Sequence, residues 1–96
     1  EITEIDTAEF EARRAAGVAV LDVREPEETE LGTVPGARLV PLAAVLENPA
    51  ALGAGPYAVV CKAGMRAHRA ARALAAAGAD VVVLAGGMDA WTGGRA

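Results

Sequence analysis

The chain alternates between short apolar runs and stretches with a helical pattern. Three runs have no polar interruption, and they cover residues 18–21, 57–61 and 81–84. Such runs are typical of strands that are buried on both faces of a parallel sheet. A shorter strand is expected at residues 37–40, after the turn that Val34-Pro35-Gly36 predicts. The pattern therefore predicts several strands separated by helical sequence.

The segments between these strands carry helix signals. Asp6 can cap a helix that ends before Gly17, with Glu9 three residues on as in a capping box, and Pro26 suits the first turn of a short acidic helix. The predicted helices span residues 7–16, 26–32, 41–46 and 64–77. The last one should pack closely on the sheet, because one stripe holds mainly small side chains: Ala67, Ala70, Ala71, Leu74 and Ala77.

The alternation of strands and helices predicts an α/β domain with a central, mostly parallel sheet flanked by helices. A length of 96 residues fits a single domain, residues 1–96, with one modest core. With 53% apolar and 23% charged residues, the chain can fold without metals or disulfides. The chain begins at Glu1 rather than at a methionine, which suggests a trimmed chain or a domain of a longer protein.

Several classes of protein are excluded by what the chain lacks. The apolar runs are too short to span a bilayer and no signal segment is present, so we expect a cytoplasmic protein without membrane partners. We also expect a monomer. One cysteine and one histidine are too few for a disulfide or a structural zinc site, so we expect no metal and no cofactor. A net charge of −4 argues against a nucleic-acid partner.

The charges are unevenly distributed along the chain. Residues 1–47 hold eleven acidic and four basic side chains, whereas no carboxylate lies between Glu47 and Asp80. That middle stretch carries Lys62, Arg66, Arg69 and Arg72, the last two interpreted as a solvated helix face. We therefore expect a locally positive environment around Cys61.

Cys61 ends an apolar strand just before a predicted helix. In open α/β sheets, sites form where the carboxyl ends of strands lead into helices. The unpaired amides of a helix N-terminus favour an anion, and Gly64 lets the loop curl around it. Together with Lys62 and Arg66, these amides should favour the thiolate of Cys61. The alternative is a buried, inert cysteine, which the adjoining glycine and cations argue against.

Other nucleophilic chemistry has little support. The chain has no serine, which excludes a serine hydrolase. The single histidine, His68, lies within the predicted helix, where a partly exposed surface position is the simpler interpretation than a catalytic base.

The loop Cys61-x-x-Gly64-x-Arg66 resembles the active-site loop of the rhodanese family. Three further segments are similar to rhodanese motifs in the same order: residues 21–25 (LDVRE), 32–37 (GTVPGA) and 84–88 (LAGGM) followed by Trp91. The resemblance covers nearly the whole chain. Thr33 and Thr29 depart from it, because the family usually has a histidine and often an aromatic residue there.

The resemblance implies a rhodanese-like fold and a sulfurtransferase. Cys61 would take a sulfane sulfur from a small anionic donor such as thiosulfate and pass it to cyanide, a thiol or a carrier protein. The amides of Lys62, Ala63, Gly64, Met65 and Arg66 would surround the outer sulfur, and the Lys62 and Arg66 side chains would hold the donor. Asp22 and Arg24 would support the site from the neighbouring strand, most simply as an ion pair that fixes loops.

Two other functions remain open. A cysteine phosphatase or arsenate reductase also uses a cysteine loop that ends in arginine, but those loops resemble a pattern with five intervening residues, and here there are four, Lys62 to Met65. The domain could instead be a persulfide carrier or a docking module with little turnover. The acidic residues 25–30 would then be a docking surface, although a solvated helix is the simpler interpretation.

Overall fold

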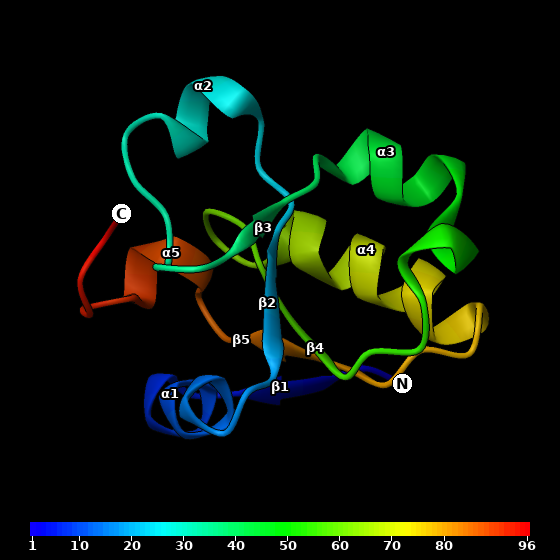
Figure 1. Cartoon of the computed structure of the whole chain (residues 1–96), viewed down its shortest axis with the longest axis horizontal. Coiled ribbons are helices and arrows are strands. Elements are labelled where there is room, and N and C mark those ends of the chain that lie inside the picture. Colours follow the sequence, from blue (N-terminus) through cyan, green and yellow to red (C-terminus); the bar gives the residue numbers. More distant parts are fainter.

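Five parallel strands form the central sheet of the computed structural model, which describes residues 1–96 (Figure 1). Their order across the sheet is β1-β5-β4-β2-β3, and every neighbouring pair is parallel. The strands are β1 (Thr3–Ile5), β2 (Ala19–Asp22), β3 (Arg38–Leu39), β4 (Tyr57–Val60) and β5 (Val81–Leu84). The predicted α/β class and parallel sheet are confirmed.

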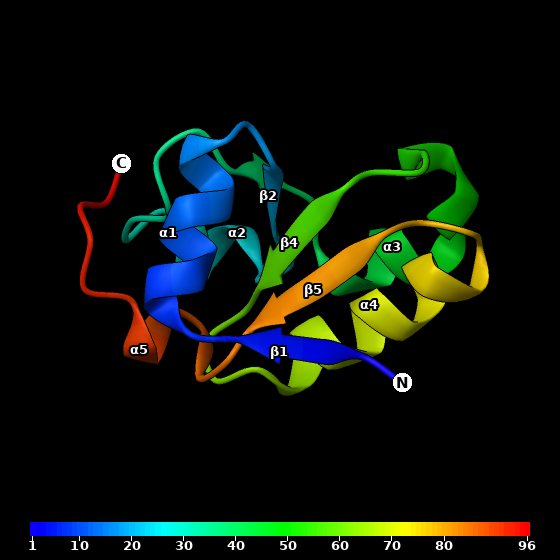
Figure 2. The same cartoon turned by 90° about the horizontal axis from the view of Figure 1, so that it is seen from below.

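Helices cover both faces of the sheet. They are α1 (Thr7–Ala15), α2 (Pro26–Thr29), α3 (Leu42–Glu47), α4 (Met65–Ala76) and α5 (Gly87–Ala90), with a short 3₁₀ helix, η1 (Pro49–Leu52). Figure 2 shows α1 on the opposite side of the sheet from α3 and α4. None of these helices has the length and apolarity needed to cross a membrane.

Two apolar clusters lie on the two faces of the sheet. One holds Leu21, Val59 and the inner side of α4, and the other holds Val20, Val60 and Phe10 of α1. Neighbouring residues of β2 and β4 thus belong to opposite clusters, as the alternation of side chains along a strand requires. Burial on both faces explains why these strands are apolar without interruption.

The longer helices follow their sequence signals. Asp6 caps α1, and one of its side-chain oxygens accepts the amide of Glu9 at 2.8 Å. α4 begins after Gly64, whose φ of +114° is in the left-handed region that favours glycine. The predicted stripe of α4 is buried except for Ala77, which is exposed because it lies beyond the last helical turn.

The shortest elements differ from prediction or were missed. β3 has two residues instead of four, and both are exposed at the sheet edge. The sequence pattern gave no signal for β1, η1 or α5, which have three or four residues each. Elements of this length are stabilised by neighbours rather than by local periodicity.

Candidate active site

The site lies at the carboxyl ends of the central strands, where β4 leads into α4. Cys61 follows the last residue of β4, and residues 61–64 form the loop to α4, which we call the cysteine loop. The side chain of Cys61 turns into the cluster beneath α4, and the residue is only 1% exposed. The predicted position of the cysteine between strand and helix is therefore observed.

Backbone amides hold the Cys61 sulfur. The amide of Gly64 donates to Sγ at 3.0 Å, and the amide of Ala67, in the first turn of α4, donates at 3.3 Å. The sequence indicated Gly64 but not Ala67. The other amides of this segment, at Lys62, Ala63, Met65 and Arg66, donate to no acceptor within the chain. The two amides that donate to Sγ lie at the N-terminus of a helix, where they stabilise negative charge on the sulfur. The amides without an acceptor can bind a second anionic atom next to it.

Arg66 forms a two-point ion pair with Glu28 of α2. Its Nη1 and Nη2 lie 2.6 and 2.9 Å from the two carboxylate oxygens. The hydrogen bonds that Arg66 donates to Glu28 raise the pKa of Arg66 and lower the pKa of Glu28 to about 2. The pair links the start of α4 to α2, 38 residues earlier in the chain.

Lys62 also has an acidic partner. Its Nζ lies 3.0 and 3.2 Å from the carboxylate oxygens of Asp89 in α5, and both side chains are more than half exposed. With Arg66 held by Glu28, both cations near the cysteine are neutralised by carboxylates distant in sequence. The locally positive environment expected around Cys61 is therefore reduced at Lys62 and Arg66, because the expectation counted only neighbours along the chain.

The start of α5 fixes the cysteine loop from the other side. The amide of Met88 donates to the carbonyl oxygen of Cys61 at 2.7 Å, and that of Asp89 to the carbonyl of Lys62 at 3.0 Å. Gly87 makes this approach possible, since a Cβ at that position would lie 2.3 Å from the Cys61 carbonyl oxygen. Gly87 thus serves close backbone packing.

Asp22 and Arg24 form the expected ion pair beneath the site. Arg24 Nη2 lies 2.7 Å from Asp22 Oδ2, and both side chains are at least 95% buried. The hydrogen bond to Asp22 raises the pKa of Arg24. Thr33 donates to the same carboxylate at 2.7 Å, and Arg24 also donates to the carbonyl of Gly32 at 2.8 Å. This network joins the end of β2 to the loop after α2.

A family model described as the rhodanese-like domain matches residues 6–93. The chain belongs to the rhodanese-like domain family. Its resemblance to rhodanese motifs is thereby confirmed, and a sulfurtransferase-family role follows for this rhodanese-like domain.

Individual relatives span nearly the whole chain. Putative sulfurtransferase YtwF of Bacillus subtilis is 33% identical over 97% of this chain and 93% of its own. The crystal structure of a rhodanese-like domain protein from Staphylococcus aureus superposes with a TM-score of 0.87 at 31% identity, covering 99% of this chain and 97% of that one. A Rhodopseudomonas palustris protein described as a possible tyrosine phosphatase gives 0.80 at 27% identity, covering 94% and 79%.

His68 forms no hydrogen bond with the cysteine in this rhodanese-like domain. Its Nε2 lies 2.6 Å from a carboxylate oxygen of Glu4 in β1, and its side chain is 27% exposed. The partly exposed position expected from the sequence is observed.

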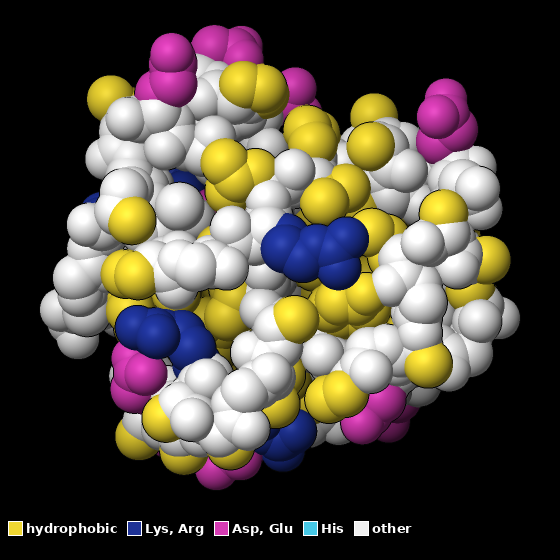
Figure 3. Space-filling view, viewed as in Figure 1, with side chains coloured by type: hydrophobic (Ala, Val, Ile, Leu, Met, Phe, Trp, Pro, Cys, Tyr) yellow, Lys and Arg dark blue, Asp and Glu magenta, His cyan; other side chains and the backbone are white.

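Glu28 is one of the site residues that sequence reasoning missed, together with Ala67 and Asp89. The sequence predicts a solvated helix for the acidic residues 25–30, and Figure 3 shows acidic side chains gathered over α2. Only Glu28 turns inward to Arg66. Its position three residues after Glu25, with which it forms the capping box of α2, was an available local signal, but that signal does not predict the long-range partner.

Glu28→Gln should remove a stabilisation that depends on pH. Because folding lowers the pKa of Glu28 from 4.5 to about 2, its contribution is fully present above pH 4.5 and is lost as the pH falls towards 2. We expect Glu28→Gln to cost about 0.5–1 kcal/mol at pH 7, since the pair is partly exposed, and to cost nothing near pH 2.

Thermal unfolding of wild type and variant across this pH range is the measurement. Glu27→Gln is the matched control, because Glu27 lies in the same helix without an ion-pair partner. A difference between wild type and Glu28→Gln that is constant with pH would contradict the assigned ion pair.

Proposed function

We propose that this domain moves sulfane sulfur from a small anionic donor such as thiosulfate to a thiophilic acceptor through a persulfide on Cys61. One observation carries the proposal: Cys61 Sγ accepts two backbone amides at the N-terminus of α4. Such amides stabilise a thiolate, which is the reactive form of a cysteine.

The first step is a displacement at the outer sulfur of the donor. The Cys61 thiolate attacks that sulfur and forms a new S–S bond, while the old S–S bond of thiosulfate breaks and its electron pair leaves with sulfite. The free amides of Lys62, Ala63, Met65 and Arg66 supply donors for the outer sulfur of the resulting anion.

The side chains of Arg66 and Lys62 are the proposed donor-binding cations. Each is already paired, so the donor has to compete with Glu28 for Arg66 and with Asp89 for Lys62. The exposed Lys62 pair is the easier one to break, because exposed pairs contribute little. The buried Asp22–Arg24 pair keeps the supporting loops in place.

The second step regenerates the free thiolate of Cys61. A nucleophilic acceptor attacks the outer sulfur, the bond to Sγ breaks, and its electron pair restores the Cys61 thiolate. Cyanide yields thiocyanate in this step, and a thiol or a carrier protein is the proposed cellular acceptor. We propose that the domain works as a cytoplasmic monomer without metal or cofactor, since neither step requires a metal, a cofactor or a second chain.

The phosphatase alternative has less support from the loop. Only four residues separate Cys61 from Arg66. The smaller ring of amides suits one sulfur atom better than a tetrahedral oxyanion.

An assay with thiosulfate and cyanide tests the proposal. We expect catalytic formation of thiocyanate and no hydrolysis of para-nitrophenyl phosphate. A single turnover without catalysis would favour the persulfide carrier, and phosphate release without thiocyanate would overturn sulfur transfer.

A further inference from the structure

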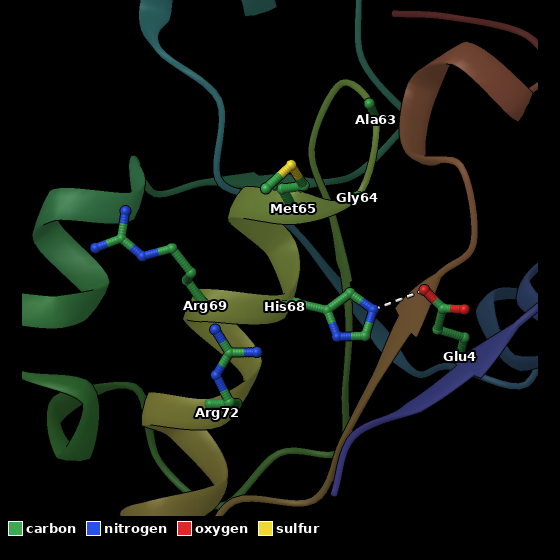
Figure 4. Close-up of a pocket in the computed structure, with 7 residues that line it drawn as sticks. All are labelled: Glu4, Ala63, Gly64, Met65, His68, Arg69 and Arg72. Carbon is green, nitrogen blue, oxygen red and sulfur yellow. Dashed lines mark hydrogen bonds and ion pairs between the residues drawn. The ribbon is translucent and has the colours of Figure 1, made fainter.

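A pocket of about 390 Å³ lies beside the cysteine loop (Figure 4). Its wall combines the loop, the exposed side of α4 and one residue of β1. Cys61 does not line it, but Gly64 does, and the Gly64 amide donates to Cys61 Sγ at 3.0 Å. The pocket thus adjoins the proposed sulfur site without containing the sulfur.

Two arginines of this pocket have no partner in the protein. Arg69 and Arg72 are exposed and form neither an ion pair nor a side-chain hydrogen bond, whereas each of the other seven lysines and arginines has at least one. They extend from neighbouring turns of α4, and Figure 4 shows no interaction drawn to either guanidinium group. The two cations that the chain leaves uncompensated therefore line the same pocket.

The acidic residue of the pocket is already engaged. The Glu4 carboxylate pairs with His68, and Figure 4 shows this contact on the opposite side of α4 from Arg69. No other carboxylate lines the pocket. Two guanidinium groups three residues apart can hold one or two carboxylates of a ligand.

We propose that this pocket binds the carboxylate end of a low-molecular-weight thiol and thereby selects anionic thiols as sulfur acceptors. The inference rests on the proposed function of Cys61. An anion as small as thiosulfate held by Arg69 and Arg72 does not touch Cys61, because the cysteine is not part of the pocket wall. A longer molecule anchored there can extend its thiol past Gly64 to the persulfide.

Sulfur transfer from Cys61 to the anchored thiol conserves atoms and electrons. The acceptor thiolate attacks the outer sulfur of the Cys61 persulfide and forms a new S–S bond. The bond between that sulfur and Sγ breaks, and its electron pair leaves on Cys61. The products are the acceptor persulfide and the free cysteine thiolate, with no oxidant or reductant needed.

Selectivity between two matched peptides tests the pocket. Cysteinyl-glycyl-glutamate carries two carboxylates, and cysteinyl-glycyl-glutaminamide carries none at nearly the same size. We expect the double variant Arg69→Gln/Arg72→Gln to lower the ratio of their second-order transfer rates by about tenfold, as the loss of two exposed charge contacts implies. Arg13→Gln/Arg14→Gln, with the same change of net charge on α1, should leave the ratio unchanged.

A binding measurement tests the pocket without relying on sulfur transfer. Seryl-glycyl-glutamate is unreactive, and on the unloaded protein it should shift the amide NMR signals of Gly64, Arg69 and Arg72 more than its diamide does. Equal shifts with both peptides, or an unchanged rate ratio in the double variant, would overturn the pocket assignment. Normal peptide binding without persulfide formation would instead refute the proposed function and leave the pocket assignment standing.

Discussion

Cys61→Ala abolishes thiocyanate formation from thiosulfate and cyanide if the proposed chemistry is correct. The variant removes the only sulfur that can carry the persulfide, since the chain has one cysteine. Activity should fall to the uncatalysed rate. The fold should survive, because Cys61 behaves as a small buried side chain in the cluster beneath α4.

Cys61→Ser is the matched variant for this result. Its hydroxyl can accept the amides of Gly64 and Ala67 as Sγ does, so the loop keeps its hydrogen bonds while the nucleophile is lost. Both variants should therefore be inactive, with unfolding temperatures near that of wild type. Substantial activity in either one would contradict the role of Cys61.

Asp22→Ala should produce the largest loss of stability. It leaves the guanidinium of Arg24, which is 5% exposed, without its carboxylate partner, and it also removes the acceptor of the Thr33 hydroxyl. Removing one member of a buried ion pair costs about 3–5 kcal/mol. For a domain of this size, that loss lowers the unfolding temperature by about 12 °C or more.

Two further variants serve as comparisons for the unfolding temperature of Asp22→Ala. Thr33→Val removes one hydrogen bond from the same network and should cost only about 1 kcal/mol, so it reports on the network even if Asp22→Ala does not fold. Glu9→Ala breaks the exposed pair with Arg13 and should cost less than about 1 kcal/mol. If Asp22→Ala proves as mild as Glu9→Ala, the buried pair does not stabilise the fold.

Local patterns were sufficient for the central elements. β2, β4 and β5 are buried on both faces, so apolar runs marked each of them. α1 and α4 are long enough for caps and glycine stops to define their ends to within one or two residues. β1 and α5 have too few residues for any periodicity, and they form because they add to a sheet edge or close on the cysteine loop.

The position of the nucleophile could also be predicted, but its electrostatic surroundings could not. Cys61, Gly64 and Arg66 lie within one segment, and the strand-to-helix junction placed them together. The carboxylates of Glu28 and Asp89 that neutralise Arg66 and Lys62 come from α2 and α5. A charge count along the chain cannot include such partners, because they become neighbours only when the sheet forms.

The cysteine loop is held on three sides in the folded domain. The start of α5 binds two loop carbonyls, the amide of Ala67 in α4 donates to the sulfur, and Glu28 of α2 binds Arg66 just after the loop. Rigid support of this kind keeps backbone donors in position before an anion forms, which reduces the reorganisation needed during the reaction.

The central claim, a persulfide on Cys61, is tested most directly by the intact mass of the reduced protein before and after incubation with thiosulfate. We predict a gain equal to one sulfur atom that cyanide removes and that Cys61→Ala does not show. An unchanged mass in wild type while thiocyanate is being formed, or the same gain in Cys61→Ala, would contradict the account.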